Sequence, residues 1–149
     1  MKRRVVGLRG WSEEDTRDAG DWWAEAIASA APGCSLGAPA PRMQVCGLEG
    51  DATAVTLDGE AAGVAVVASG RNLICLLSLR ADVRGWGYGS EAVVLLTGGA
   101  GPPWQALAAP SVGLSLYFWL RLGFAPADSQ PFRPAALLME RLNSTQEQE

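Results

Sequence analysis

The chain has 149 residues, of which 48% are hydrophobic and 19% charged, and its net charge is -4. This length suits one domain that buries about two thirds of its unfolded surface. No apolar run approaches the roughly 20 residues of a membrane span. The basic start at residues 1–4 is followed by too few apolar residues for a signal peptide. We therefore expect a cytoplasmic protein with no membrane partner. Because the chain has no run of basic residues to contact phosphates, we do not expect nucleic acid as a partner either.

The chain contains no histidine. This absence excludes Ser-His and Cys-His nucleophilic catalysis, a histidine general base and the commonest metal ligand. Cys34, Cys46 and Cys75 form no C-x-x-C pair, so we interpret all three as buried apolar residues rather than zinc ligands or disulfide partners. We expect no metal cofactor.

The first predicted element is an amphipathic helix over residues 13–30. Ser12 is suited to the N-cap position, with Asp15 three residues later. Apolar residues recur at helical spacing, namely Trp22, Trp23, Ala26, Ile27 and Ala30. Because Trp22 and Trp23 are adjacent, their side chains point about 100° apart, and at most one lies squarely in the core. The other is available to cover a partner or an acceptor pocket.

A loop and three strands follow this helix. Residues 31–41 are dense in glycine and proline, which predicts a loop. Strands are predicted over 52–57 and 62–68, joined by an Asp-Gly turn at 58–59 that is a strong hairpin signal. A third strand spans 73–79. We expect these three strands to be antiparallel neighbours.

The stretch Arg84-Gly85-Trp86-Gly87-Tyr88-Gly89 joins that third strand to a helical pattern over 90–97. Its glycines let backbone N–H groups converge, and the helix N-terminus adds about half an elementary charge. This pattern predicts an anion site suited to pyrophosphate. It is not a phosphate loop of the G-x-x-x-x-G-K-[ST] type, because the only lysine is Lys2, and its spacing differs from G-x-G-x-x-G.

The rest of the chain predicts a strand over 104–109, a helix from 111 or 112 to 122, and a last pair of strands that begins at 124–125 and closes at 136–142. Gly123 suits the residue after the helix, where positive φ is needed. Residues 1–142 are thus expected to form a single domain, and the polar tail 143–149 to be disordered.

Three of these segments, in this order, resemble the GNAT superfamily of N-acyltransferases. The R-x-x-G-x-G pattern at 84–89, after an apolar-x-apolar strand end at 77–79, resembles its coenzyme A pyrophosphate loop. The helix at 115–122, ending in Gly-Phe, is similar to its second signature, and 136–142 resembles its closing strand. The resemblance covers residues 51–142. It implies an α+β fold of the GNAT acyl-CoA N-acyltransferase type, with a mixed, mostly antiparallel central sheet that is splayed at the cofactor site and flanked by helices.

The resemblance also implies that acetyl-CoA binds as a cosubstrate. The residues expected to bind it lie on the strand end and the glycine loop: Leu77, Ser78, Leu79, Arg84, Gly85, Trp86, Gly87, Tyr88, Gly89 and Ser90. The splayed strand would pair with the pantetheine arm as with an added strand. One of its N–H groups would stabilise the oxyanion, and Arg84 with the loop amides would hold the pyrophosphate.

The catalytic residues depart from the family pattern. The family often has a tyrosine four residues before the glycine of the Gly-Phe pair, where it protonates the departing thiolate, but this chain has Trp119 there. An indole N–H is no acid at neutral pH. Tyr117 is the catalytic candidate, although it lies roughly 200° around an ideal helix from Trp119, and the alternative is a core aromatic. The strand over 73–79 lacks the carboxylate that some members use as a general base.

Three functions therefore stay open. The first is an N-acetyltransferase, an enzyme of EC 2.3.1 type, in which a small-molecule or peptide amine attacks acetyl-CoA directly. The second is a catalytically inactive coenzyme A-binding module that acts as a sensor or partner subunit, which Trp119 favours. The third is an interaction domain without a cofactor. Acidic residues of the first helix suit a cationic acceptor, although a solvated face explains them equally well. A homodimer paired through the last strands is compatible with this fold.

Overall fold

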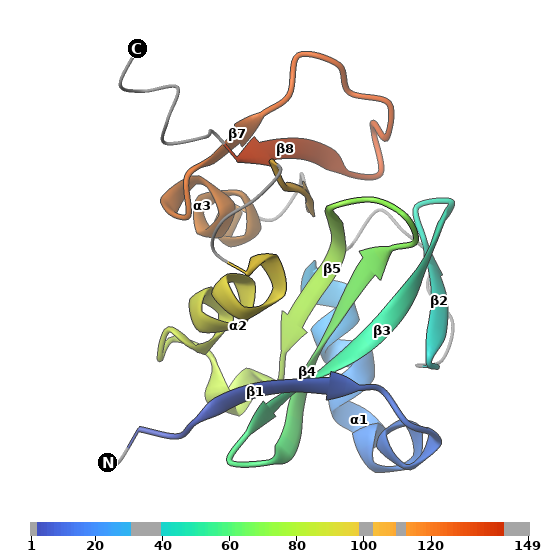
Figure 1. Ribbon diagram of the computed structural model, residues 1–149, viewed down its shortest axis with the longest axis vertical. Coiled ribbons are helices and arrows are strands. Elements are labelled where there is room, and N and C mark those ends of the chain that lie inside the picture. Colours follow the sequence, from blue (N-terminus) through green and yellow to red (C-terminus); the bar gives the residue numbers. More distant parts are fainter. Residues whose placement is uncertain (1–2, 31–39, 99–102, 110–112, 142–149) are drawn as a thin grey trace.

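The computed structural model describes residues 3–30, 40–98, 103–109 and 113–141, which form one eight-stranded sheet with helices on both faces (Figure 1). The strands are β1 (Val6–Gly10), β2 (Arg42–Val45), β3 (Leu48–Leu57), β4 (Glu60–Ala68), β5 (Leu73–Leu79), β6 (Gln105–Ala108), β7 (Phe124–Pro126) and β8 (Leu137–Arg141). The helices are α1 (Glu13–Ala30), α2 (Tyr88–Thr97) and α3 (Gly113–Arg121), with a 3-10 turn η1 (Ala81–Val83). The sheet order is β1, β3, β4, β5, β6, β8, β7, and β2 pairs with β3. The predicted α+β fold with a mostly antiparallel sheet is confirmed.

Two tight hairpin turns lie at the opposite ends of β3. The predicted turn between β3 and β4 is confirmed, with positive φ at both Asp58 (51°) and Gly59 (86°), as a type I′ turn requires. Cys46 and Gly47 form a second such turn, with φ of 50° and 82°. This second hairpin adds β2 and extends β3, and the sequence analysis predicted neither feature. It also missed β1, which pairs antiparallel with β3.

The helices separate onto the two faces of the sheet. Side chains of α1 pack into one core cluster, whereas those of α2 and α3 pack into two others (Figure 1). Within α1, Trp23 is buried and Trp22 half-buried, so the prediction that only one of the two lies in the core is confirmed. The predicted bounds of α1 hold, but Gly20 interrupts the helix with φ 49° and ψ -133°. A residue without a Cβ adopts such a conformation at little steric cost.

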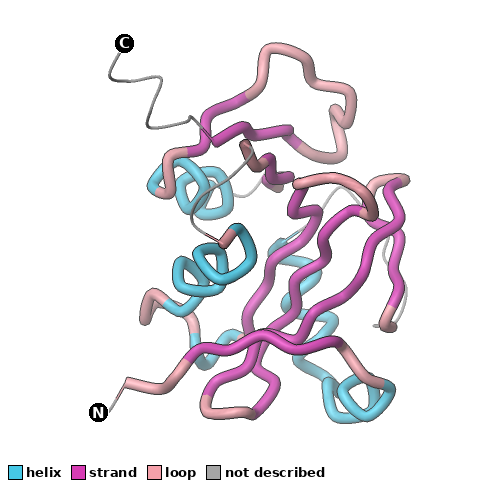
Figure 2. Tube along the Cα trace, in the orientation of Figure 1, coloured by secondary structure: helices cyan, strands magenta, loops and turns pink. Residues whose placement is uncertain are grey.

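The sheet is splayed between β5 and β6. These parallel strands pair only at Leu73 with Gln105 and at Ile74 with Ala106. At the same level the register of β5 against β4 shifts, so that Cys75 is the extra residue of a bulge. A bulge bends its strand. Beyond Cys75, β5 therefore follows β4 while β6, β8 and β7 continue apart from it (Figure 2).

The cysteines differ in part from the prediction. Cys75 is buried and free, as expected. Cys46 is half-buried and disulfide-bonded, so its interpretation as a buried apolar residue is wrong. Local spacing could not reveal this, because a disulfide depends on which residues the fold brings together. Cys34, most of the predicted loop 31–41 and the tail 143–149 lie outside the described residues.

The described ranges contain neither a candidate membrane span nor a candidate metal site. No helix there is both long and apolar enough to cross a membrane. No group of His, Cys, Asp or Glu side chains in the same ranges could hold a metal ion.

Candidate functional site

The edge of β5 that faces the splay carries backbone groups directed away from β4. Leu79 lies opposite Gly63, and the Arg80 N–H donates to the Ala62 carbonyl oxygen at 2.8 Å. Because alternate residues of an antiparallel strand face their partner, the backbone groups of Leu77 and Leu79 point to the other side. In the described ranges no strand pairs with that side beyond Ile74. The expected divergence of the strand end at 77–79 from its neighbour is therefore present.

The glycine loop after η1 leads directly into the N-terminus of α2. Gly85 and Gly87 have φ of 86° and 84°, a region that disfavours side chains with a Cβ. Gly87 is the N-cap and offers no side-chain hydrogen bond, and the first helical bond runs from the Glu91 N–H to the Gly87 oxygen at 3.2 Å. The N–H groups of residues 88–90 come before that bond and have no intrahelical acceptor. This arrangement is suited to an anion.

Gly89 has a different role from the other two glycines. Its φ is not positive, but a Cβ on it would lie 3.2 Å from Cε1 of Phe118 on α3. Glycine there lets the Phe118 ring pack closely against the first turn of α2. Gly85 and Gly87 thus serve the loop backbone through their positive φ, and Gly89 serves the packing of α3 while its N–H stays at the start of α2.

Arg84 links the loop to both β5 and α1. Its Nε donates to the Leu79 carbonyl oxygen at 2.9 Å, and its Nη1 lies 3.4 Å from Oε1 of Glu25. A guanidinium has five N–H donors, so these two contacts leave others available for a phosphate oxygen. The contact with Leu79 also holds the loop against the open edge of β5. Glu25 had not been predicted to contact the loop.

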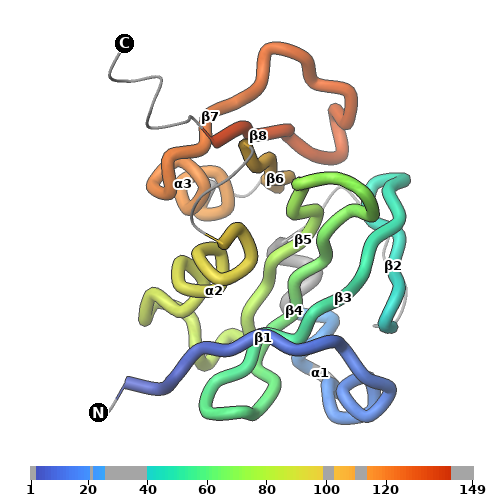
Figure 3. The backbone as a smooth tube through the Cα atoms, viewed as in Figure 1, coloured from blue at the N-terminus to red at the C-terminus, as the bar shows by residue number. Residues whose placement is uncertain are grey.

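Arg3 is a second cation at the glycine loop, and the sequence analysis missed it. Its Nη1 donates to the Trp86 carbonyl oxygen at 2.6 Å, it forms an ion pair with Glu91, and its Cζ lies 4.8 Å from the centre of the Tyr88 ring. The Arg4 N–H also donates to the Tyr88 hydroxyl oxygen at 3.2 Å. The N-terminal segment thus runs past the start of α2 (Figure 3). No motif marks Arg3, because its position depends on the pairing of β1.

The other predicted binding residues differ in exposure. The Tyr88 side chain is buried and Ser78 is buried, Leu77 and Ser90 are half-buried, and Trp86 is exposed. Of Tyr88, therefore, the backbone N–H rather than the ring is available to a ligand. The structure brings the predicted strand end and loop together around the start of α2.

The aromatic residues of α3 divide between core and surface. Trp119 is 3% exposed, and its ring centre lies 5.0 Å from that of Phe118 and 5.0 Å from that of Phe124. Tyr117 is 57% exposed, with the Arg121 guanidinium 5.6 Å from its ring centre. The alternative that Tyr117 is a core aromatic is therefore wrong. Its catalytic role stays a prediction.

Cys75 is the one ionisable side chain of β5. Burial is the main cause that raises the pKa of its thiol to about 11. The thiol is therefore protonated at neutral pH and does not act as a base or nucleophile.

Comparison with known proteins identifies the fold. No family model and no curated protein matches the chain. Solved structures do match: an acetyltransferase from Agrobacterium tumefaciens has a TM-score of 0.67 at 18% identity, covering 96% of this chain and 94% of its own. One from Thermus thermophilus has a TM-score of 0.67 at 15% identity, covering 94% and 99%. The PaiA N-acetyltransferase of Thermoplasma acidophilum, in complex with coenzyme A, has a TM-score of 0.58 at 12% identity, covering 93% and 99%.

Proposed function

From the premise that the chain has the fold of the GNAT superfamily, we propose that it transfers an acetyl group from acetyl-CoA to an amine. The observation that carries this proposal is the open edge of β5 beside the glycine loop of α2. The coenzyme A complex of the Thermoplasma protein supports the same donor.

The residues present fit the two halves of coenzyme A. The pantetheine arm carries amide groups, which can pair with the outward backbone groups of Leu77 and with the outward N–H of Leu79 as an added strand would, while Arg84 donates to the Leu79 carbonyl oxygen. The pyrophosphate is anionic and suits the N-terminus of α2. Arg84 and Arg3 add guanidinium donors beside this N-terminus, although each already has a carboxylate partner, Glu25 for Arg84 and Glu91 for Arg3.

The chemistry needs little from side chains. Acetyl-CoA supplies a thioester, whose carbonyl carbon forms a bond to the neutral amine nitrogen as the carbon–sulfur bond breaks. An outward N–H of β5 would donate to the carbonyl oxygen as negative charge develops on it. We assign the Tyr117 hydroxyl as the proton donor to the leaving thiolate, and Tyr117 then regains a proton from water. The proton that the amine loses passes to water. This last assignment follows from the absence of a carboxylate on β5.

A second candidate is a GNAT-fold module that binds coenzyme A without catalysis. The observation that favours it is the burial of Trp119 at the usual position of the tyrosine. The packing of its ring between Phe118 and Phe124 leaves no acidic group there. Such a module would bind coenzyme A through the same loop and release no free thiol from acetyl-CoA.

Release of free thiol from acetyl-CoA, measured with a panel of primary amines, separates these candidates. Acetyl transfer predicts amine-dependent release that falls at least about tenfold in Arg84→Ala. Arg71→Ala is the matched control, because Arg71 is an exposed arginine in the turn before β5. Coenzyme A binding without release would favour the second candidate. A folded protein that neither binds nor reacts would contradict both.

A further inference from the structure

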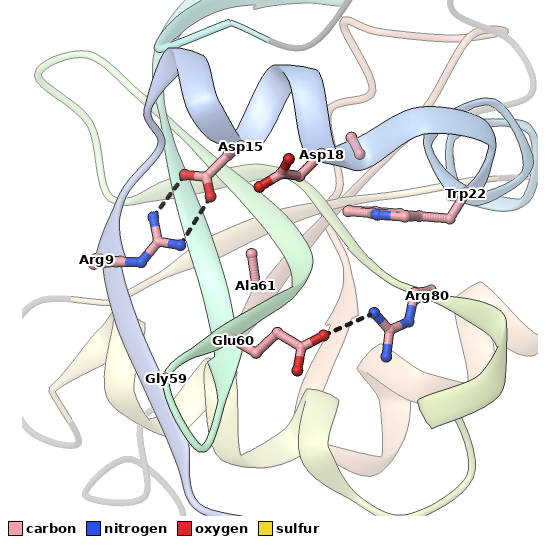
Figure 4. A pocket seen from close by; sticks show the side chains of 9 residues that line it. Arg9, Asp15, Asp18, Trp22, Gly59, Glu60, Ala61 and Arg80 are labelled. Carbon is pink, nitrogen blue, oxygen red and sulfur yellow. Dashed lines mark hydrogen bonds and ion pairs between the residues drawn. The ribbon is translucent and has the colours of Figure 1, made fainter.

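A pocket of about 380 Å³ opens beside α1, and none of its lining residues belongs to the glycine loop, α2 or α3 (Figure 4). It lies between α1, the end of β1, the turn that joins β3 to β4, and the residue that follows β5. The side chains that decide its chemistry are Arg9, Asp15, Asp18, Trp22, Glu60 and Arg80. Its volume suits a small organic molecule.

Both guanidinium groups of this pocket already have close carboxylate partners. Arg9 donates to the two oxygens of Asp15 at 2.6 and 2.8 Å. Arg80 Nε donates to Asp82 at 2.6 Å, and Asp82 is not part of the lining. An incoming anion would therefore meet two cations whose charge is compensated, and would have to displace these carboxylates.

Two carboxylates of the lining lack such close partners. Glu60 has Arg4 and Arg80 as its nearest cations, each at 3.7 Å. Both of these arginines have a closer carboxylate, which for Arg4 is Asp58 at 3.3 Å. The Asp18 carboxylate has no hydrogen bond or ion pair with any residue in the described ranges, and it points into the pocket (Figure 4). The pocket therefore carries surplus negative charge.

Trp22 adds an aromatic wall beside Asp18, on the same helix (Figure 4). Its ring is held by edge contacts with Trp11, 6.4 Å between ring centres, and with Trp23, 6.3 Å. These contacts with two core residues hold the half-buried Trp22 ring at the pocket. An aromatic face attracts a cation and also packs against an apolar chain.

We propose that this pocket binds a small organic cation, a primary ammonium or guanidinium group on a short apolar chain. Asp18 and Glu60 hold the charged group, and Trp22 packs against the chain that carries it. Glycine at position 59 and alanine at positions 19 and 61 leave room between these side chains. Binding at this pocket does not require coenzyme A, so the proposal stands or falls separately from the acetyl transfer proposed above.

The test follows the indole N–H signals of the ¹⁵N-labelled protein by NMR at neutral pH. The probes are n-butylammonium and n-pentanoate, which carry the same butyl chain with opposite charge. Trp22→Phe identifies the Trp22 signal. We expect the cation to shift this signal saturably, and the anion to leave it in place.

Two variants locate the charge. Asp18→Asn is expected to weaken n-butylammonium binding about tenfold, because it removes one charge-assisted contact. Glu14→Gln removes the same charge from an exposed residue of α1 outside the pocket and is expected to bind as the wild type does. The other indole signals show that each variant is folded. Equal shifts by both probes, unchanged binding in Asp18→Asn, or no saturable shift up to about 0.1 M cation would overturn the proposal.

Discussion

Replacing Asp15 with asparagine removes the charge that ties the first turn of α1 to β1. The residue is 5% exposed, and its carboxylate accepts two N–H bonds from Arg9 at 2.6 and 2.8 Å. It also accepts the Ser12 N–H at 2.8 Å, while the Asp15 N–H donates to the Ser12 hydroxyl at 3.2 Å. Asparagine keeps the size of the side chain and one acceptor oxygen. The loss in stability therefore reports mainly on the charge.

The magnitude follows from the pKa of Asp15. The hydrogen bond from Arg9 is the main cause that lowers this pKa from 3.8 to about 2. At about 1.4 kcal/mol per unit, the difference corresponds to roughly 2.4 kcal/mol. The Arg9 side chain is 43% exposed and partly screened by water, so we expect a loss of about 1 to 2 kcal/mol at pH 7. Because the folded-state pKa is the lower one, this stabilisation is complete well above pH 3.8 and is lost as the pH falls toward 2.

Urea unfolding of the wild type and Asp15→Asn at pH 7 and pH 3 measures both effects. The difference in free energy of unfolding between the two proteins is expected to shrink by about half at pH 3. Glu14→Gln, in the same helical turn but exposed, is expected to change stability by less than about 0.5 kcal/mol. An Asp15→Asn protein as stable as the wild type at pH 7, or a loss of equal size at both pH values, would refute the reasoning.

Three further changes test the donor site. Arg3→Ala should weaken coenzyme A binding about tenfold and leave pantetheine binding unchanged, because Arg3 contacts the glycine loop and not β5. Calorimetry measures both affinities. An equal loss of affinity for coenzyme A and for pantetheine would place Arg3 outside the phosphate site. Gly87→Ala should cost roughly 1 to 2 kcal/mol in urea unfolding and weaken coenzyme A binding, because φ of 84° disfavours alanine; an unchanged affinity would contradict the loop geometry. Tyr117→Phe should lower kcat about a hundredfold with an unchanged KM for acetyl-CoA; an unchanged kcat would remove Tyr117 as the proton donor.

The central elements of the fold could be predicted because their signals are local. The apolar run of β5 and the Asp58-Gly59 turn each mark one element within a few residues. The strands β1 and β2 gave no such signal, because they are short and lie at the edge of the sheet. Only their pairing with β3 makes them strands, and pairing is a tertiary interaction.

The same distinction separates the predicted and the missed site residues. Arg84 and the glycines that follow it form one contiguous motif, so their placement beside β5 could be expected from the sequence. Arg3 and Glu25 contact this motif from distant parts of the chain, and no pattern marks them. The division of Trp22 and Trp23 between pocket and core followed from helical geometry. Helical geometry could not show which carboxylates of α1 have an arginine partner, because the partner of Asp15 is Arg9 from β1.

Calorimetric titration of coenzyme A tests the donor site most directly. The wild type is expected to bind, and a variant with Arg84→Ala and Gly87→Val is expected to lose binding while circular dichroism shows it still folded. The two substitutions remove one guanidinium from the loop and place a branched side chain where φ is 84°. Absence of binding at millimolar coenzyme A by a folded wild type, or equal binding by the variant, would contradict the proposed donor site.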